Sequence, residues 1–242
     1  DGCGVDAKAL EAYGKELSTQ AEELKAKLFD YAGHEFNPNS TKELGKVLFD
    51  PNELGLPPLK KTKTGYSTSA EVLERLRGNH PIIQTLLDYR KLTKLTSTYT
   101  TGLLKVIGQD GRVHSTFNQT ETRTGRISST EPNVQNIPVR TPQGSRLREF
   151  FVPREGWVLV DADYSQIELR LLAHIADDEH MLQAFRDGED IHRRTASQVL
   201  GIPASQITPQ QRSSAKAINF GIVYGISAFS LSQDIHVSVP NI

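Results

Sequence analysis

The sequence contains one cysteine, one methionine and one tryptophan, and no long uninterrupted hydrophobic run. With Cys3 alone, the chain cannot form an internal disulfide or a zinc site built from several cysteines. No apolar stretch is long enough to cross a membrane, and the acidic, polar first residues do not resemble a secretory signal. The GxxxxGK[ST] pattern of P-loop NTPases is also absent. We therefore expect a soluble, cytoplasmic globular protein with no membrane partner.

An overall excess of positive charge is missing as well, since the formal net charge is −1. The basic residues are nevertheless concentrated. Residues 60–105 hold nine cations and three acids, a balance of +6, and residues 112–154 hold seven arginines and three glutamates, a balance of +4. Such asymmetry arises by chance or marks a surface that follows a phosphate backbone. The tip at residues 59–69 is polar and basic, and is interpreted as a solvated loop or as part of that surface.

Residues 208–225 carry the pattern with the most chemical content. Thr208 followed by Pro209 predicts a helix start. Arg212, Lys216, Phe220 and Tyr224 are spaced four apart, so they share one face, which extends about 18 Å along the axis. A separate apolar stripe is formed by Ala215, Ile218 and Ile222. Cations near a helix N-terminus followed by aromatic rings match a nucleoside triphosphate, whereas a solvated face has no use for the rings.

A second candidate site lies at residues 157–168. Val158, Leu159 and Val160 predict a buried strand that leads into Asp161 and Asp163, and a helix is expected over residues 166–176. A carboxylate at the end of a buried strand is a common place for a divalent cation. Alternation puts Asp161 and Asp163 on the same face, so spacing does not distinguish which of them binds metal, and helix capping remains an alternative.

The other elements follow from periodicity and capping signals. Asp190 and His192 open a further helix at residues 193–200, where the histidine either caps the helix or binds phosphate. The stretch at residues 120–141 is polar, without hydrophobic period, and rich in hydrogen-bond donors, which suits contact with a sugar–phosphate backbone. Helices are expected at 6–32, 40–49 (with Glu43 in a capping box), 69–77 and 81–104, a strand–turn–strand at 105–118 and a strand at 147–152.

Three stretches together resemble the family A DNA polymerases, of the bacterial DNA polymerase I type. They read TGRISSTEPNVQNIPVRTPQG, DADYSQIELRLLAHIADD and RSSAKAINFGIVYG. The first is similar to that family's primer–template-binding stretch, the second to its motif A, and the third to its motif B, R-x3-K-x3-F-x3-YG. The resemblance covers nearly the whole chain.

The resemblance implies roles for individual residues. Asp163 matches the first metal-binding carboxylate, and Tyr164 matches a residue whose backbone carbonyl also binds the metal, with two Mg²⁺ ions as cofactor. Asp163 and Lys216 are the implied catalytic residues, and Glu168 matches the gate against a ribose 2′-hydroxyl. The implied dNTP contacts are Gln166, Glu168, His192, Arg212, Lys216, Phe220 and Tyr224. The implied DNA contacts are Arg126, Gln135 and Asn136.

The implied fold is α+β, an incomplete right-hand polymerase with a helical thumb, an antiparallel-sheet palm and helical fingers. The expected segments are a thumb at residues 1–104, the first half of the palm at 105–175 and the start of the fingers at 176–242. The family's second metal-binding aspartate lies in a His-Asp-Glu motif, which this sequence lacks. We therefore expect the chain by itself to be weakly active or inactive, with the missing C-terminal part as a candidate partner.

The implied activity is template-directed DNA synthesis, with primer–template DNA and dNTP as partners. The alternative from another class is a module that binds primer–template DNA without catalysis. A single-subunit RNA polymerase shares the architecture, but the carboxylate of Glu168 argues against it, because it should exclude ribonucleotides.

Overall fold

In a computed structural model of the chain, the structure describes residues 2–63, 65–139 and 141–225. The chain divides into two compact units, residues 1–160 and residues 161–242. The mixture of helices and small antiparallel sheets confirms the α+β class. The three predicted segments remain a prediction, because a division by compactness does not test them.

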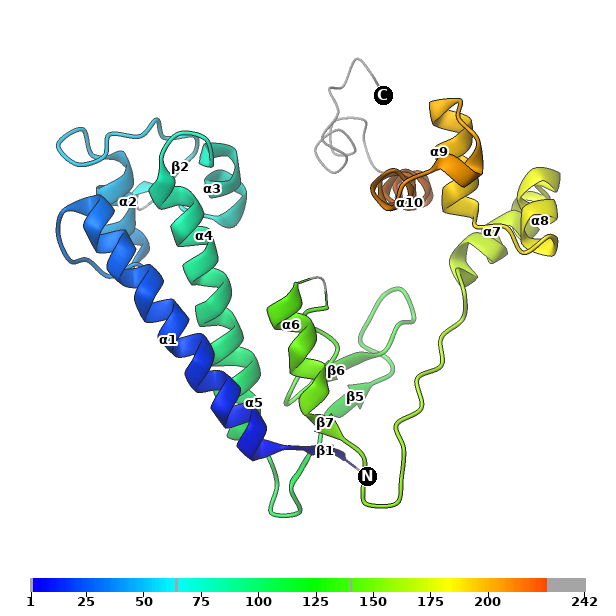
Figure 1. Ribbon diagram of the computed structural model, residues 1–242, viewed down its shortest axis with the longest axis horizontal. Helices are drawn as coiled ribbons and strands as arrows, with labels where there is room; N and C mark the ends of the chain where they lie inside the picture. The colour runs from blue at the N-terminus through cyan, green and yellow to red at the C-terminus, as the bar shows by residue number, and fades with distance from the viewer. Residues whose placement is uncertain (1, 64, 140, 226–242) are drawn as a thin grey trace. The chain divides into compact units, whose positions relative to one another are not determined.

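Two long helices form the frame of unit 1 and lie side by side (Figure 1). Helix α1 spans Ala7–Ala32 and α4 spans Pro81–Lys94. Asp6 caps α1 by accepting a hydrogen bond from the Ala9 N–H, and Gly33 ends it at a φ of 75°, a value that favours glycine. Helix α1 therefore begins and ends where the sequence predicts, whereas α4 begins at the predicted residue but ends at Lys94 instead of Leu104.

The threonine-rich continuation of α4 is not regular α-helix. Residues Leu95–Thr101 form a π-helical segment, η1, followed by the short α5 at Gly102–Leu104. The hydroxyl of Thr96 donates to the Leu92 carbonyl, and that of Thr100 donates to the Thr96 carbonyl. A Cβ at Gly14 would lie 2.9 Å from the Thr100 hydroxyl oxygen, so glycine there permits the close approach of α1 to η1.

Shorter elements close the far end of this helical frame. Helix α2 (Thr41–Phe49) is capped by Ser40 as predicted, but the Glu43 carboxylate accepts from the Asn37 N–H, so the predicted reciprocal box is not formed. Helix α3 spans Ala70–Leu76. The basic tip folds as an exposed hairpin of β2 (Lys61–Thr62) and β3 (Gly65–Tyr66).

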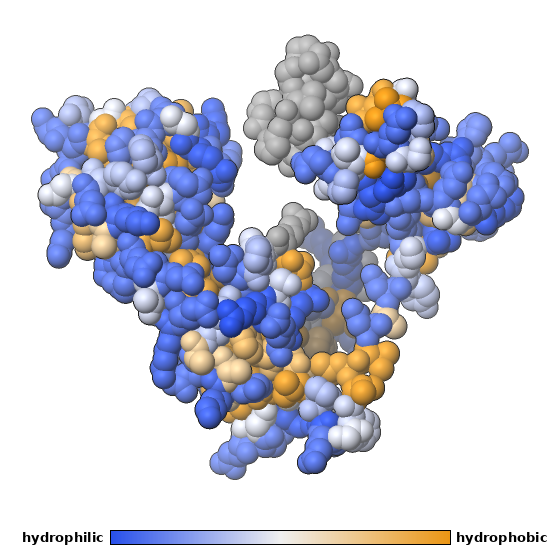
Figure 2. Space-filling model, viewed as in Figure 1, coloured by the Kyte–Doolittle hydropathy of each residue, from blue (hydrophilic) through white to orange (hydrophobic). Residues whose placement is uncertain are grey.

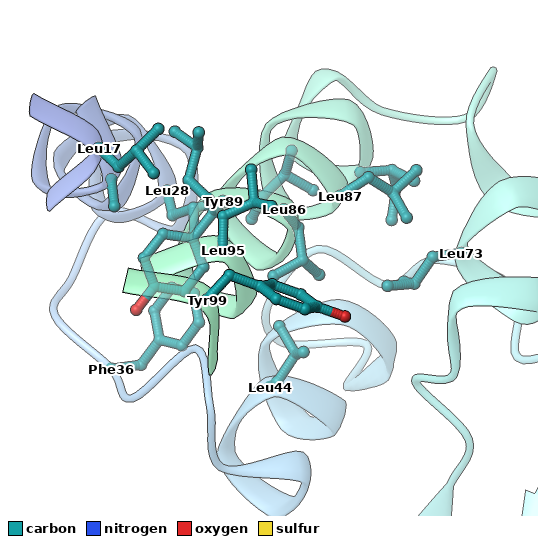
Figure 3. Close-up of a cluster of buried hydrophobic side chains, with 14 of the residues drawn as sticks. Leu17, Leu28, Phe36, Leu44, Leu73, Leu86, Leu87, Tyr89, Leu95 and Tyr99 are labelled. Atoms are coloured by element: carbon teal, nitrogen blue, oxygen red, sulfur yellow. The ribbon is translucent and has the colours of Figure 1, made fainter. Parts of the chain in front are cut away.

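The core of unit 1 is a single cluster of leucines and aromatic residues between these helices (Figure 3). Leu17, Leu28, Leu44, Leu73 and Leu86 each expose no more than 1% of their surface. Hydrophilic residues cover most of the outward face of the same helices in Figure 2. The buried residues of α1 recur at helical spacing: Leu10, Tyr13, Leu17, Ala21 and Leu28.

The sheets of unit 1 are small and antiparallel. Strand β1 (Cys3–Val5) lies between β4 (Arg112–Val113) and β7 (Phe151–Val152), and β5 (Thr116–Asn118) pairs with β6 (Ser128–Thr130). The predicted turn at residues 108–111 is present, bridged by Ile107 and Val113. The predicted strand at 147–152 is mostly wrong, because α6 (Pro142–Arg146) continues into the 3₁₀ helix η2 (Leu147–Phe150).

The predicted buried strand at residues 157–160 is also wrong. Trp157, Val158, Leu159 and Val160 are irregular and expose 69%, 77%, 59% and 82% of their surfaces. A continuous apolar run is buried as a strand only where neighbouring strands and a covering layer exist. No strand among the described residues pairs with this segment.

Unit 2 is helical as far as the structure describes it, and none of the described helices is long and apolar enough to span a membrane. Leu169, Ala184 and Ile191 form one small core, and Ala196, Ile207 and Ala215 form another. Its elements are α7 (Ile167–Ala176), α8 (Glu179–Arg186), α9 (Ile191–Leu200), the 3₁₀ turn η3 (Ala204–Gln206) and α10 (Pro209–Tyr224).

Leu17→Ala should lower the free energy of unfolding by about 2–5 kcal/mol, because Leu17 is fully buried and its truncation leaves a cavity between packed helices. Leu59→Ala is the matched control in the same unit, since Leu59 is 39% exposed and should cost less than about 0.5 kcal/mol. Urea unfolding followed by far-UV circular dichroism compares the two. Equal losses would mean that the cluster is not the stabilising core.

Candidate functional site

Helix α10 begins where the sequence predicts. The Thr208 hydroxyl accepts a hydrogen bond from the Gln211 N–H at 3.2 Å, and the Gln211 side-chain oxygen accepts one from the Thr208 N–H at 2.9 Å. This reciprocal capping satisfies N–H groups that have no partner inside the helix. It places Arg212 in the second turn of α10, near the positive end of the helix dipole.

Helix α9 begins at an aspartate that also holds α10. One carboxylate oxygen of Asp190 accepts from the N–H groups of His192 and Arg193, at 3.0 and 3.2 Å. The other oxygen lies 2.5 Å from Nε of Arg212. Burial by itself would raise the pKa of Asp190, but the Arg212 hydrogen bond and charge and the two backbone hydrogen bonds hold that pKa below its ordinary value. The carboxylate is therefore ionised at neutral pH and aims Arg212 along the face shared by α9 and α10.

His192 lies in the first turn of α9 with 2% of its surface exposed. Its Nδ1 is 2.9 Å from the Asn219 side-chain nitrogen, and the ring of Phe220 lies beside it, with centroids 5.8 Å apart. Burial, and then the charges of Arg212 and Lys216, lower the pKa of His192, and the charge of Asp190 opposes them. The predicted capping is done by Asp190, and a phosphate reaches the histidine only after its covering side chains move.

The rest of the predicted stripe continues along α10. The Lys216 ammonium lies 5.9 Å from the centroid of the Phe220 ring, within cation–π range, and Lys216 is exposed. Of the predicted apolar stripe, Ala215 is 1% exposed and packs in the second core of unit 2, Ile218 is half-buried, and the side chain of Ile222 lies outside the described part of the structure. The backbone of Tyr224 ends α10, and its side chain lies outside the described part of the structure.

The predicted metal-binding residues lie ahead of α7 and not on α9 or α10. Asp163 and Tyr164 lie in an irregular, exposed segment, and Tyr164 exposes 79% of its surface. Gln166 adopts a left-handed conformation just before the helix, and the half-buried Glu168 lies in the first turn of α7.

The oxygens of Asp163 and Tyr164 are of the type that binds a magnesium ion, but two residues supply too few ligands for one. Carboxylate and carbonyl oxygens are the ligands that Mg²⁺ takes, and it commonly keeps waters and substrate phosphates as the remaining ligands. No group of three or more metal-ligating side chains occurs among the described residues. A cation held here therefore needs oxygens from a bound substrate or from other residues.

The three predicted DNA contacts lie in unit 1, in the polar stretch around β6. Arg126, Gln135 and Asn136 are all exposed. The Gln135 side-chain nitrogen donates to the Ile127 carbonyl at 3.0 Å, and the Tyr99 hydroxyl donates to the Asn136 carbonyl at 2.5 Å. The stretch is thus held in shape by its own polar groups and by a buried tyrosine, which leaves its surface accessible.

Sequence reasoning missed the residues that join the two helices. Asn219 was read only as part of the small-residue end of motif B, yet its Nδ2 reaches His192 and its Oδ1 lies 3.1 Å from the Thr195 hydroxyl. Asp190 was read as a helix start without its bond to Arg212. The spacing of Asn219, seven residues after Arg212 on the same helix side, was the available signal.

The lowered pKa of His192 predicts a pH dependence. Because the unfolded chain takes up this proton at a higher pH than the folded chain, the stabilisation is complete above about pH 6.5 and is lost as the pH falls below it. His192→Gln should therefore lose less unfolding free energy than the wild type between about pH 7.5 and 5.5.

His34→Gln is the control of opposite sign. The hydrogen bonds of His34 with the Glu35 carbonyl and then the Glu53 carboxylate raise its pKa, so its stabilisation is present at low pH and lost as the pH rises. Urea-unfolding midpoints across this range measure both. Parallel pH profiles for the wild type and His192→Gln would contradict the assignment.

The chain is similar to known proteins along almost all of its length. The model of DNA polymerase family A matches residues 7–241. DNA polymerase I of Geobacillus stearothermophilus is 53% identical over 98% of this chain, and the thermostable DNA polymerase I of Thermus aquaticus is 52% identical over 98%. The chain spans 27% and 28% of the lengths of these two relatives.

A solved structure adds the fold. The structure described as the POL domain of Pol1 from M. smegmatis in complex with DNA primer-template and dNTP matches 99% of this chain at 43% identity, with a TM-score of 0.87, and the match covers 42% of that protein. With a family model that spans nearly every residue and a capped α10 that carries motif B, this chain belongs to DNA polymerase family A.

Proposed function

We propose that this chain takes part in template-directed DNA synthesis, the transfer of a nucleotide from a dNTP to a primer 3′-hydroxyl. The observation that carries the proposal is the shared face of α9 and α10. Arg212, Lys216 and Phe220 follow one another along it at four-residue intervals, with His192 beside Phe220. Its supports are membership of the family and the relatives named DNA polymerase I.

The residues of this face contact different parts of the nucleotide. Arg212 and Lys216 bind the β- and γ-phosphates and neutralise the charge that develops on the leaving pyrophosphate. Phe220 and Tyr224, one and two turns further along α10, contact the sugar and base. Gln166 and Glu168 approach the sugar from α7, where Glu168 excludes a 2′-hydroxyl. In this proposal Arg212 and Lys216 act before any bond is broken, by fixing the phosphates in position.

Asp163 and the Tyr164 carbonyl hold the divalent cations of the reaction, for which we propose two Mg²⁺ ions. When bound, these ions activate the attacking hydroxyl and stabilise the leaving group. The exposed position of Asp163 leaves its oxygens accessible to a cation and to substrate phosphates. The contribution of the chain is a carboxylate and a carbonyl on consecutive residues directly ahead of α7.

Primer–template DNA binds along the polar stretch of unit 1. Arg126, Gln135 and Asn136 contact the duplex near the primer end, and the exposed hairpin β2–β3 contacts the phosphate backbone. In this proposal residues 1–104 form the thumb, 105–175 the first part of the palm and 176–242 the start of the fingers. The basic balance of residues 60–105 and 112–154 supports the assignment.

The test exchanges the matching segment of a full-length family A polymerase for this chain. The chimera should extend a primer on a template with dNTP and Mg²⁺, and Asp163→Ala should abolish extension while primer–template binding, measured by fluorescence anisotropy without metal, is retained. A folded chimera that binds DNA and does not extend would overturn the catalytic proposal in favour of a DNA-binding module.

Arg212→Ala and Lys216→Ala should each weaken dNTP binding by about 10- to 100-fold, because each removes charge-assisted hydrogen bonds to phosphate. Arg186→Ala is the matched control, since Arg186 is an exposed cation at the end of α8, away from the stripe. Titration of the chimera–DNA complex with a fluorescent dNTP measures the affinities. An effect of Arg186→Ala as large as that of Arg212→Ala would indicate only a loss of general positive charge.

Glu168→Ala should raise ribonucleotide incorporation relative to deoxyribonucleotide by about 10- to 200-fold, because it removes the group that excludes the 2′-hydroxyl. Glu179→Ala is the control, since it removes an exposed glutamate from the first turn of the next helix. Single-nucleotide incorporation by the chimera gives the ratio. Unchanged sugar selection in Glu168→Ala would remove this role.

A further inference from the structure

A row of three side chains joins α9 to α10 beside the proposed nucleotide face. The Asn219 side-chain nitrogen lies 2.9 Å from Nδ1 of His192, and the Asn219 side-chain oxygen lies 3.1 Å from the Thr195 hydroxyl. His192 is 2% exposed, and Thr195 and Asn219 are half-buried. Only His192 is thus shielded from water, and the hydrogen bonds that join the three side chains have to be mutually consistent.

The chemistry of the amide determines where the proton of His192 lies. An amide nitrogen only donates, so Nδ1 has to accept and carries no proton. In a neutral imidazole the proton is then on Nε2. A proton on Nδ1 would place two donors 2.9 Å apart, so the cation and the other tautomer both break this hydrogen bond.

Thr195 contacts the amide from the other side. Its hydroxyl has a single proton to donate, and both the Asn219 side-chain oxygen at 3.1 Å and the Ile191 carbonyl at 2.9 Å lie within reach of it. Donated to Asn219, this proton favours the orientation with the amide nitrogen toward Nδ1, which leaves Nδ1 unprotonated. Donated to Ile191, it frees the hydroxyl oxygen to accept from a reversed Asn219, whose oxygen would favour a protonated Nδ1. The Asn219 side-chain nitrogen, 2.9 Å from Nδ1, corresponds to the first arrangement.

The charges that face this row come from three elements. Arg212 and Lys216 of α10 disfavour a charged His192, and Asp190 at the start of α9 favours it. Asp178 and His180, at the start of α8, and Arg194 of α9 line a cavity of about 300 Å³ together with Thr195 and Asn219. The geometry of the amide, rather than any one charge, is what distinguishes the two nitrogens of the ring.

We propose that Asn219 and Thr195 are positioning residues that hold His192 as a neutral imidazole with its proton on Nε2, ready to donate to a phosphate of the incoming nucleotide. The inference rests on the proposed function for its ligand. A neutral donor beside Arg212 and Lys216 adds a hydrogen bond to the phosphates without adding a third mutually repelling cation. Once Phe220 and the other covering side chains move aside, Nε2 is the nitrogen left to meet the nucleotide.

The first readout needs no nucleotide. In the full chain with isotope-labelled histidine, imidazole nitrogen shifts report the tautomer, and His192→Gln identifies the His192 signals. We expect an unprotonated Nδ1 and a protonated Nε2 at neutral pH. Asn219→Asp, which replaces the donor with an acceptor of the same shape, should protonate Nδ1 and move the titration midpoint of His192 to higher pH. Gln210→Glu, the same chemical change at an exposed position in the first turn of α10, should leave the signals unchanged.

Thr195→Val removes the hydroxyl at constant shape and should produce a mixture of Nδ1-protonated and unprotonated signals. Ser197→Ala is its control, because Ser197 lies in the same helix but its hydroxyl donates to the carbonyl of Ile202, beyond the end of α9. A protonated Nδ1 in the wild type, or an unchanged His192 in Asn219→Asp, would overturn the proposal whatever the chain binds.

The second readout is dNTP affinity of the chimera–DNA complex as a function of pH. Asn219→Asp and Thr195→Val should each bind dNTP about 2- to 10-fold more weakly, the size expected for one hydrogen bond. Asn219→Asp should in addition show a pH dependence that the wild type lacks near neutrality. Wild-type affinity in both variants, with Arg212→Ala still impaired, would overturn the positioning role and leave the proposed function standing. If the wild-type complex does not bind dNTP, both the positioning role and the proposed function are overturned. This outcome is distinguishable because it is observed in the wild type, without any variant.

Discussion

The carboxylate of Asp190 is the interaction on which the candidate site depends. One of its oxygens accepts hydrogen bonds from two N–H groups at the start of α9 that have no partner inside the helix. The other oxygen accepts a hydrogen bond from the guanidinium of Arg212 on α10. Because an ionised carboxylate gains from every one of these donors, its pKa stays low although burial opposes ionisation. Without it, α9 would lose its cap and Arg212 its direction.

In unit 1, too, single side chains connect two separate elements. The rings of Tyr13 of α1 and Tyr99 of η1 are buried in the helical core. The Tyr13 hydroxyl donates to the Gln143 carbonyl of α6, and the Tyr99 hydroxyl donates to the Asn136 carbonyl of the polar stretch. A tyrosine suits this position because one end is apolar and the other needs a hydrogen-bond partner. Tyr99 therefore ties the polar stretch, which has no core of its own, to the helical core, and Tyr13 does the same for α6.

Features that depend on neighbouring residues could be predicted from the sequence, and features that depend on distant residues could not. The helix starts predicted near residues 6, 40 and 208 and the helix end predicted at residue 32 depend on contacts within four or five residues, and the structure confirms them. The strand predicted at residues 157–160 was wrong because burial of an apolar run depends on what covers it, and nothing within the run contains that information. Strand β1 was missed because three residues show no alternation to read, and it is a strand through its partners β4 and β7.

For the candidate site, the sequence by itself determined which side chains share one face of α10, because helical spacing depends only on the chain. It also determined the family, through three long motifs in order. The tertiary structure alone decided that Asp190 binds Arg212, that His192 is buried and that Asn219 and Thr195 meet it. Those contacts join residues 22 to 27 positions apart across two helices. Their packing angle and separation set the hydrogen bonds, and periodicity along a single helix carries no information about either.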